Sequence, residues 1–133
     1  MSALGPLQVA VVARLKADAG FGALAGDRVY DGPAPEGTML PFATLDSPTG
    51  VEEGGALGTH GFGHTFMLHA FHSDATGNKG VTEFATVCKA ALRATLTVSG
   101  HIATKLTLEF ETVLIEPNKR HMPMRFRVQT WET

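Results

Sequence analysis

Six histidines are the first residues of this 133-residue sequence with side chains suited to chemistry: His60, His64, His69, His72, His101 and His121. A zinc site needs three or four ligands that converge on one point. On an extended strand His64 and His72 share one face while His69 points the other way, and His60 could join only from a neighbouring loop. We therefore predict sheet-face or solvated histidines and no metal ligands, with a small histidine-dependent metal hydrolase as the alternative.

Other patterns that carry catalysis in small domains are missing from the sequence. There is no Gly-x-Ser-x-Gly turn for a nucleophile and no glycine loop that ends in Lys-Ser or Lys-Thr. The carboxylates Asp46, Glu52, Glu53 and Asp74 lie in polar stretches, which lack the apolar surroundings that acid catalysis requires. We predict no catalytic residues, no cofactor and no enzyme activity, and instead a role in binding or assembly.

Composition narrows the class of protein further. The net charge of −2 and the pI near 6.3 give no general affinity for nucleic acid or an anionic membrane. No run of 18 apolar residues and no secretory signal is visible. The one cysteine, Cys88, excludes an internal disulfide and a cysteine-based zinc site. We expect the protein to be located in a reducing cytoplasm, or in an assembly that is built there.

The strongest structural pattern is a strand over residues 64–71 followed by a helix over about 81–95. Apolar residues recur along this helix at spacings of three and four, which places them on one stripe. They are Val81, Phe84, Ala85, Cys88, Ala91, Leu92 and Leu96. A helix with one apolar side requires a sheet to cover that side.

The remaining segments supply this sheet. An opening helix starts near Gly5-Pro6 and ends near Gly20, and short strands are expected over 28–31 and 40–45. Alternation of apolar and polar residues predicts two further strands over 106–115 and 122–129. The sequence therefore predicts an α+β fold with a mostly antiparallel sheet and two α-helices packed on one face. We expect a single domain over residues 1–133.

Residues 46–61 are rich in Gly, Ser, Pro, Thr and Glu. Such a composition predicts a long flexible loop, and loops of this length are usually functional. Glu52 and Glu53 would give the loop an acidic tip. It is either a solvated loop or a segment that becomes ordered on assembly.

Charges on the last two expected strands suggest a register for the pair. Pairing Phe110 with Phe126 on the buried face sets Glu111 opposite Arg125 and Glu109 opposite Arg127 on the outer face. This charged face is either a solvated ladder or a contact with another subunit. Lys119 and Arg120, in the expected turn over 116–120, add to the basic character.

Several segments of the sequence together carry a resemblance to a known family. They are Ala13–Asp18, Arg28–Asp31, Leu40–Leu45, His64–Phe71, Val81–Leu92 with the following Leu96–His101, and Met124–Val128. In their order, spacing and total length these segments resemble the tail-completion proteins of long-tailed bacteriophages and gene transfer agents. These are also called tail terminators or head–tail joining proteins.

The resemblance implies a structural virion protein with no catalytic residues to carry over. Such proteins form a ring, expected to be hexameric, at the head-proximal end of the tail tube. The ring stops tube polymerisation and joins the tail to the head connector, while DNA passes transiently through the lumen. The implied partners are further copies, tail tube protein and the head completion protein, with no membrane. A different minor tail or tube-related component on a similar fold is the alternative.

Overall fold

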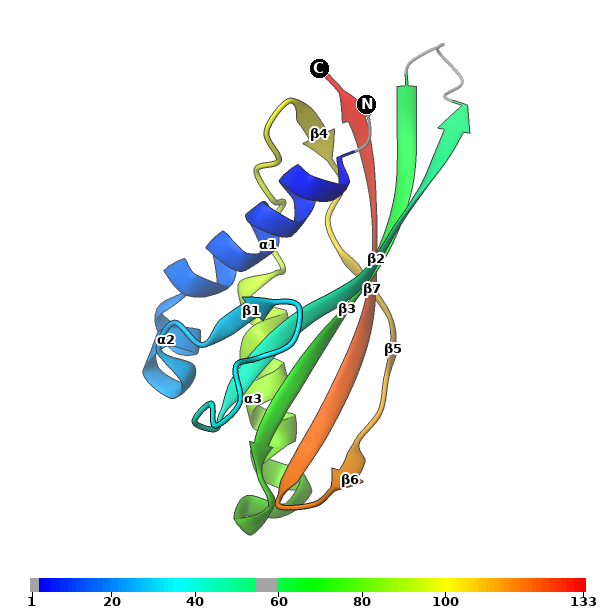
Figure 1. Cartoon of the computed structure of the whole chain (residues 1–133). Helices are drawn as coiled ribbons and strands as arrows, with labels where there is room; N and C mark the ends of the chain where they lie inside the picture. The colour runs from blue at the N-terminus through cyan, green and yellow to red at the C-terminus, as the bar shows by residue number, and fades with distance from the viewer. Residues whose placement is uncertain (1–2, 55–59) are drawn as a thin grey trace.

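A single twisted sheet covered on one side by helices forms the body of the protein (Figure 1). This computed structural model describes residues 3–54 and 60–133. The helices are α1 Leu4–Ala17, α2 Ala19–Ala25 and α3 Gly77–Ala91, with a short 3-10 turn, Asp74–Thr76, before α3. All three α-helices lie on the same side of the sheet, which confirms the predicted α+β class and adds one short helix to the two expected.

The strands form one mixed, mostly antiparallel sheet in the order β1-β2-β3-β7-β4, with β5 and β6 also pairing with β7. Their bounds are β1 Val29–Asp31, β2 Phe42–Gly54, β3 His60–Ser73, β4 His101–Ala103, β5 Thr107–Glu111, β6 Leu114–Glu116 and β7 Lys119–Glu132. Among the described strands, β1 and β2 alone run parallel. Because β4, β5 and β6 follow one another along β7, they form one interrupted edge of the sheet, called here the broken edge.

The core lies between the helices and the covered face of the sheet. From α3 it receives the predicted stripe, since Val81, Phe84, Ala85, Cys88 and Ala91 are all buried. This helix begins four residues earlier than predicted and ends at Ala91, yet Leu92 and Leu96 beyond it remain in the core. Burial raises the pKa of the Cys88 thiol to about 12, so that the thiol stays neutral and unreactive.

The prediction of a flexible loop over residues 46–61 is wrong for the described residues. Residues Asp46–Gly54 continue β2, and the pairing with β3 runs from Phe42 opposite Phe71 to Gly54 opposite His60. A bulge between Asp46 and Thr49 separates two regular halves of this ladder. Glycine, serine and proline weaken a strand locally, but the backbone bonds to β3 outweigh that preference. Residues 55–59 lie outside the described part of the chain.

The predicted register of the last two strands is also wrong. Leu108, not Phe110, lies opposite Phe126, and Phe110 lies opposite Arg125 after a bulge. The turn is shorter than expected, with Glu116 already paired to Lys119. Pro123 explains the break between β5 and β6. Its carbonyl oxygen accepts the Thr112 N–H at 3.3 Å, so its ring nitrogen faces the same edge without a hydrogen to donate.

Candidate interaction surfaces

No described helix lies on the side of the sheet opposite α1, α2 and α3, and this side is called here the open face (Figure 1). The register sets side chains in rows across β2, β3 and β7 on this face. The rows are Phe42, Phe71 and His121; then Thr44, His69 and Pro123; then Asp46, Met67 and Arg125. The alternate rows, such as Leu45, Leu68 and Met124, are buried beneath the helices. The open face therefore carries the polar, titratable and aromatic groups.

Aromatic rings form a stack at one end of the open face. The centroids of Phe42 and Phe71 lie 4.8 Å apart, and those of Phe71 and His121 lie 4.3 Å apart. The ammonium group of Lys119 lies 5.1 Å from the centroid of Phe71, within cation–π range. Phe42 is buried, and Phe71 and His121 are half-buried, although no helix covers them. Stacking and the cation therefore hold these rings in place.

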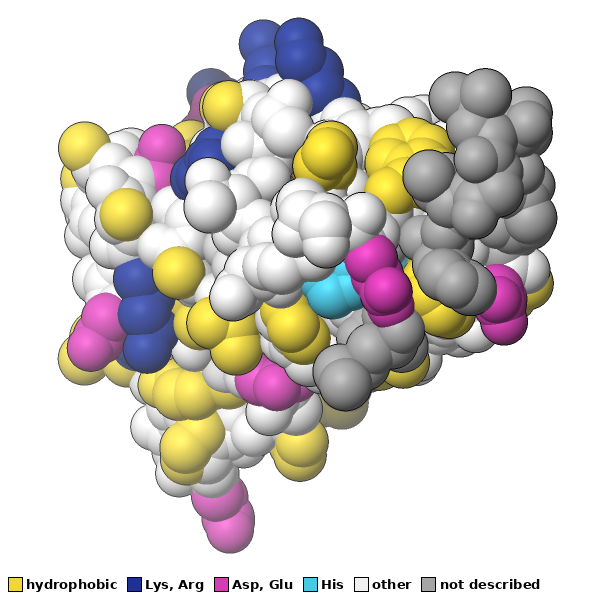
Figure 2. Space-filling model, turned by 90° about the horizontal axis from the view of Figure 1, so that it is seen from above, with side chains coloured by type: hydrophobic (Ala, Val, Ile, Leu, Met, Phe, Trp, Pro, Cys, Tyr) yellow, Lys and Arg dark blue, Asp and Glu magenta, His cyan; other side chains and the backbone are white. Residues whose placement is uncertain are grey.

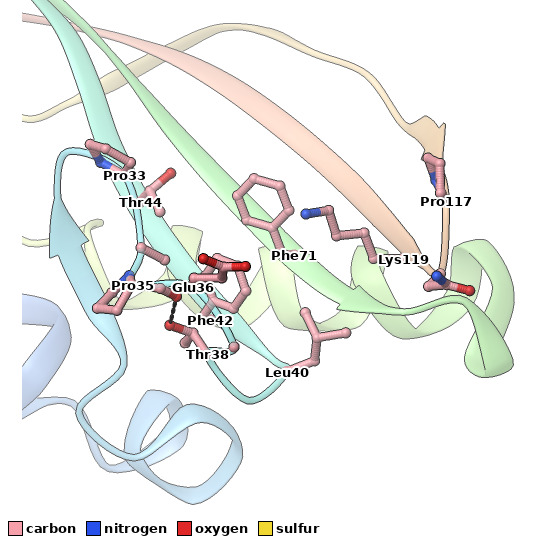
Figure 3. A pocket seen from close by; sticks show the side chains of 13 residues that line it. Pro33, Pro35, Glu36, Thr38, Leu40, Phe42, Thr44, Phe71, Pro117 and Lys119 are labelled. Carbon is pink, nitrogen blue, oxygen red and sulfur yellow. Dashed lines mark hydrogen bonds between the residues drawn. The ribbon is translucent and has the colours of Figure 1, made fainter.

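A groove of about 680 Å³ lies beside this stack. The proline-rich segment over residues 33–38 forms one wall, and the turn from Pro117 to Lys119 stands at its other end (Figure 3). Between them Phe71 and Lys119 point from the sheet toward the proline-rich segment, near Glu36. The groove is open and mostly apolar, with one cation and one carboxylate, and its walls come from three separate parts of the chain.

Four side chains form a hydrogen-bonded chain across the open face, called here the imidazole–carboxylate chain. Asp46 Oδ1 lies 2.9 Å from His69 Nε2, and His69 Nδ1 lies 2.6 Å from His121 Nε2. His121 Nδ1 then lies 2.8 Å from Glu116 Oε2. These contacts connect β2, β3, β7 and β6 in that order. They fasten the broken edge to the centre of the sheet.

The surroundings of His121 in this hydrogen-bonded chain change its pKa. Burial lowers the pKa of His121 below its ordinary value, and the nearby His69 and Lys119 charges act in the same direction. The bond to Glu116 opposes them without reversing the shift. A drop in pH therefore forces a charge onto a partly buried ring.

Neither ring is positioned for nucleophilic catalysis. In the described structure the hydrogen-bond partners of His69 and His121 are each other and the two carboxylates, with no serine, threonine or cysteine among them. His64 lies on the covered face, where its Nε2 is 2.8 Å from the Thr130 hydroxyl. Over residues 3–54 and 60–133, no three His, Cys, Asp or Glu side chains are placed to hold a metal ion. These hydrogen bonds of His64, His69 and His121 link strands of the sheet to one another.

The broken edge exposes large apolar side chains. Sequence alternation predicts a buried face for β5, but all five of its residues are exposed because α3 packs over β3 and β7 instead. Phe110 is 50% exposed and Ile115 is 74% exposed. Leu108 and Leu114 add to the same strip. Viewed from above, the surface shows hydrophobic side chains in several groups between charged ones (Figure 2).

The structure separates the charged residues that sequence analysis proposed for contacts. Arg125 Nε lies 3.4 Å from Glu109 Oε1, while Glu111 Oε2 instead bonds Lys89 Nζ of α3 at 2.9 Å. Arg127 lies opposite Thr107, not opposite Glu109.

Near the turn between β6 and β7, Lys119 faces Phe71 and Arg120 donates from Nε to Asn78 Oδ1 at 3.0 Å. Glu52 is exposed within β2, not at a loop tip. Glu53 also belongs to β2, and its side chain lies outside the described residues.

Sequence reasoning missed the imidazole–carboxylate chain and the aromatic stack. Asp46, His69, Glu116 and His121 are far apart in sequence, and only the order β2-β3-β7-β6 brings them together. The available signal was the alternation along β3, which already set His69 on the face opposite to His64.

Comparison with known proteins gives a family over nearly the whole chain. A family model described as Tail completion protein gp17 matches residues 9–133. A solved chain described as "Virion of native gene transfer agent (GTA) particle" is 26% identical over 96% of both chains, with a TM-score of 0.81. Another solved chain is 14% identical with a TM-score of 0.57, over 95% of this chain and 94% of its own, which shows the fold alone. No curated protein matches the chain, and no described helix is long and apolar enough to cross a membrane.

Proposed function

The chain belongs to the Tail completion protein gp17 family, and on that premise we propose that it is a structural tail terminator of a phage or phage-like particle. The observation that carries the proposal is the family match over residues 9–133. The likeness to a chain of a gene transfer agent virion, which spans 96% of both chains, supports it. In this role the protein has no enzymatic activity and requires no cofactor.

The finer part of the proposal is a ring, taken as hexameric, at the head-proximal end of the tail tube. The ring ends tube polymerisation and presents a surface to the head connector, and DNA passes through its lumen. Copies assemble in the bacterial cytoplasm and remain in the particle. Residues 1–133 act as one tail-terminator-like domain.

The exposed surface suits a protein that binds further copies of itself. Apolar side chains on the broken edge are exposed to water in the single chain, and a contact with another copy would bury them. A ring of identical copies needs two different patches on each copy that fit one another. The two lateral borders of one sheet are suited to provide such patches, because each carries backbone groups that can pair. Glu109, Glu111, Arg125 and Arg127 lie on or beside one of these borders.

Light scattering of the purified chain, alone and with tail tube protein, tests the proposal. A mass near six copies, with rings in negative-stain images, is the expected result. If the chain stays monomeric at high concentration and is also inert toward tube protein, the terminator role is wrong. Binding along the whole tube wall would instead favour a different tube-related component.

A further inference from the structure

The first border of the sheet lies along the second half of β2. The parallel partner β1 covers only Ala43–Leu45. In the described part of the chain no strand pairs with this side of β2 after Leu45. Thr49 and Gly50 are exposed there, and Val51 is 63% exposed. A long strand that is covered over three residues leaves a border able to accept another strand.

The opposite border is the broken edge, where β5 pairs with β7 on one side alone. Its five residues resemble the exposed half of β2 in length and carry Phe110 on the open face, opposite Arg125. Val51 also lies on the open face. It pairs with Gly63 and, across β3, with Gln129, which is four residues from Arg125 and therefore on the same face of β7. Two strands that joined here would place Val51 and Phe110 on one face, as neighbours in a ladder must be.

Strand direction favours the same junction. Each of the pairs β2–β3, β3–β7 and β7–β5 is antiparallel, so β5 runs opposite to β2. A neighbouring copy related by rotation about an axis along the strands presents its β2 in the same direction as the first. The β5 of one copy and the β2 of the next are then antiparallel, like the strand pairs β2–β3, β3–β7 and β7–β5 within each copy.

The charges on the two borders allow this contact. The two carboxylates of β5 are paired within the chain, Glu109 with Arg125 at 3.4 Å and Glu111 with Lys89 at 2.9 Å. Residues 29–78, which contain β1, β2 and β3, hold six Asp or Glu and no Lys or Arg. A head-to-tail contact therefore sets the acidic β2 border beside carboxylates that cations already neutralise, whereas a symmetric contact of two β2 borders brings like charges together.

We propose that copies of this chain join edge to edge, with the exposed half of β2 pairing antiparallel with β5 of the next copy. This inference rests on the ring in the proposed function and names the surface by which the ring closes. The contact buries Val51 and Phe110 against one another on the open face and extends each sheet into that of its neighbour.

Cross-linking of two single-cysteine variants tests the pairing. Val51→Cys and Phe110→Cys are mixed, alone and with tail tube protein, and treated with a short bis-maleimide. The buried Cys88 stays unreactive, because the pKa of its thiol is raised to about 12. We expect about tenfold more covalent dimer than from Val51→Cys mixed with Val9→Cys, since a fixed contact raises the effective thiol concentration. Val9 is 69% exposed on α1 and lies outside both borders.

A charge on the border provides the second readout. Val51→Lys should reduce the mass measured by light scattering, whereas the matched control Val9→Lys should not, and both should keep the thermal midpoint of the native chain. If oligomers form but the cross-link is absent and Val51→Lys leaves the mass unchanged, the edge pairing is wrong and the ring proposal stands. A cross-link from Val51→Cys to tube protein alone also overturns the pairing. If no oligomer forms with or without tube protein, the proposed function itself fails.

Discussion

The two faces of the sheet are stabilised by different interactions. On the covered face the rings of Phe66 and Phe126 stack with their centroids 5.5 Å apart, beneath helices that exclude water. On the open face the side chains instead interact with one another, through the imidazole–carboxylate chain and the stack of Phe42 on Phe71. The covered face holds the fold together through burial. The open face and its borders are held in shape by polar and aromatic contacts and stay available to other molecules.

The largest expected effect on stability contrasts two phenylalanines. Phe84→Ala removes a fully buried ring whose centroid lies 5.6 Å from that of Phe21. The change should lower the free energy of unfolding by about 3–5 kcal/mol. Phe110→Ala, on the half-exposed broken edge, should lower it by less than about 1 kcal/mol. Urea unfolding followed by circular dichroism measures both. Equal losses would mean that the broken edge belongs to the core.

A smaller effect is expected in the imidazole–carboxylate chain and depends on pH. Because burial lowers the pKa of His121, the folded protein binds a proton there less readily than the unfolded chain. Stability contributed by the neutral ring is present above the ordinary pKa of about 6.5 and is lost as the pH falls below it. In His121→Gln this pH dependence should weaken.

Thermal unfolding of the native chain and His121→Gln between about pH 5 and pH 8 tests this sign. The native chain should lose more stability toward low pH than the variant. His101→Gln is a suitable control, because His101 contacts the backbone oxygen of Ser99 and is not part of the imidazole–carboxylate chain. Stability that rises in the native chain as pH falls would show that the bond to Glu116 outweighs burial.

The smallest effect concerns the link between α3 and the broken edge. Lys89→Gln removes the ion pair with Glu111, whose side chain is 34% exposed. Exposed pairs contribute about 0.2–1 kcal/mol, so the free energy of unfolding should fall by no more than that, with high salt weakening the difference. A loss several times larger would show that this pair fastens β5 to the covered face.

The stripe of α3 and the alternation along β3 and β7 could be predicted because both depend on residues close in sequence. Burial of Val81, Phe84 and Cys88 follows from a helical period alone. The continuation of β2 through Glu52 could not be predicted, because its local composition favours a loop and only the pairing with β3 makes it a strand. Long-range pairing overrides local preference there.

The site was harder to predict than the fold for the same reason. A longer turn and a ladder without bulges would place Glu111 opposite Arg125. The pairing of Glu116 with Lys119 shifts the register by one residue, and the bulge next to Leu108 shifts it once more. The resulting pair, Arg125 with Glu109, keeps the predicted residue types in a different register. His69 and His121 meet only because β3 and β7 are neighbours, which composition does not reveal.

The central claim is that this chain completes a tail by ending the growth of its tube. The most direct measurement is electron microscopy of tail tube protein polymerising with and without the chain. We expect rings at one end of each tube and no further growth from that end, while tubes that lack the chain continue to lengthen. Tubes that grow equally in both samples and carry the chain at neither end would contradict this claim.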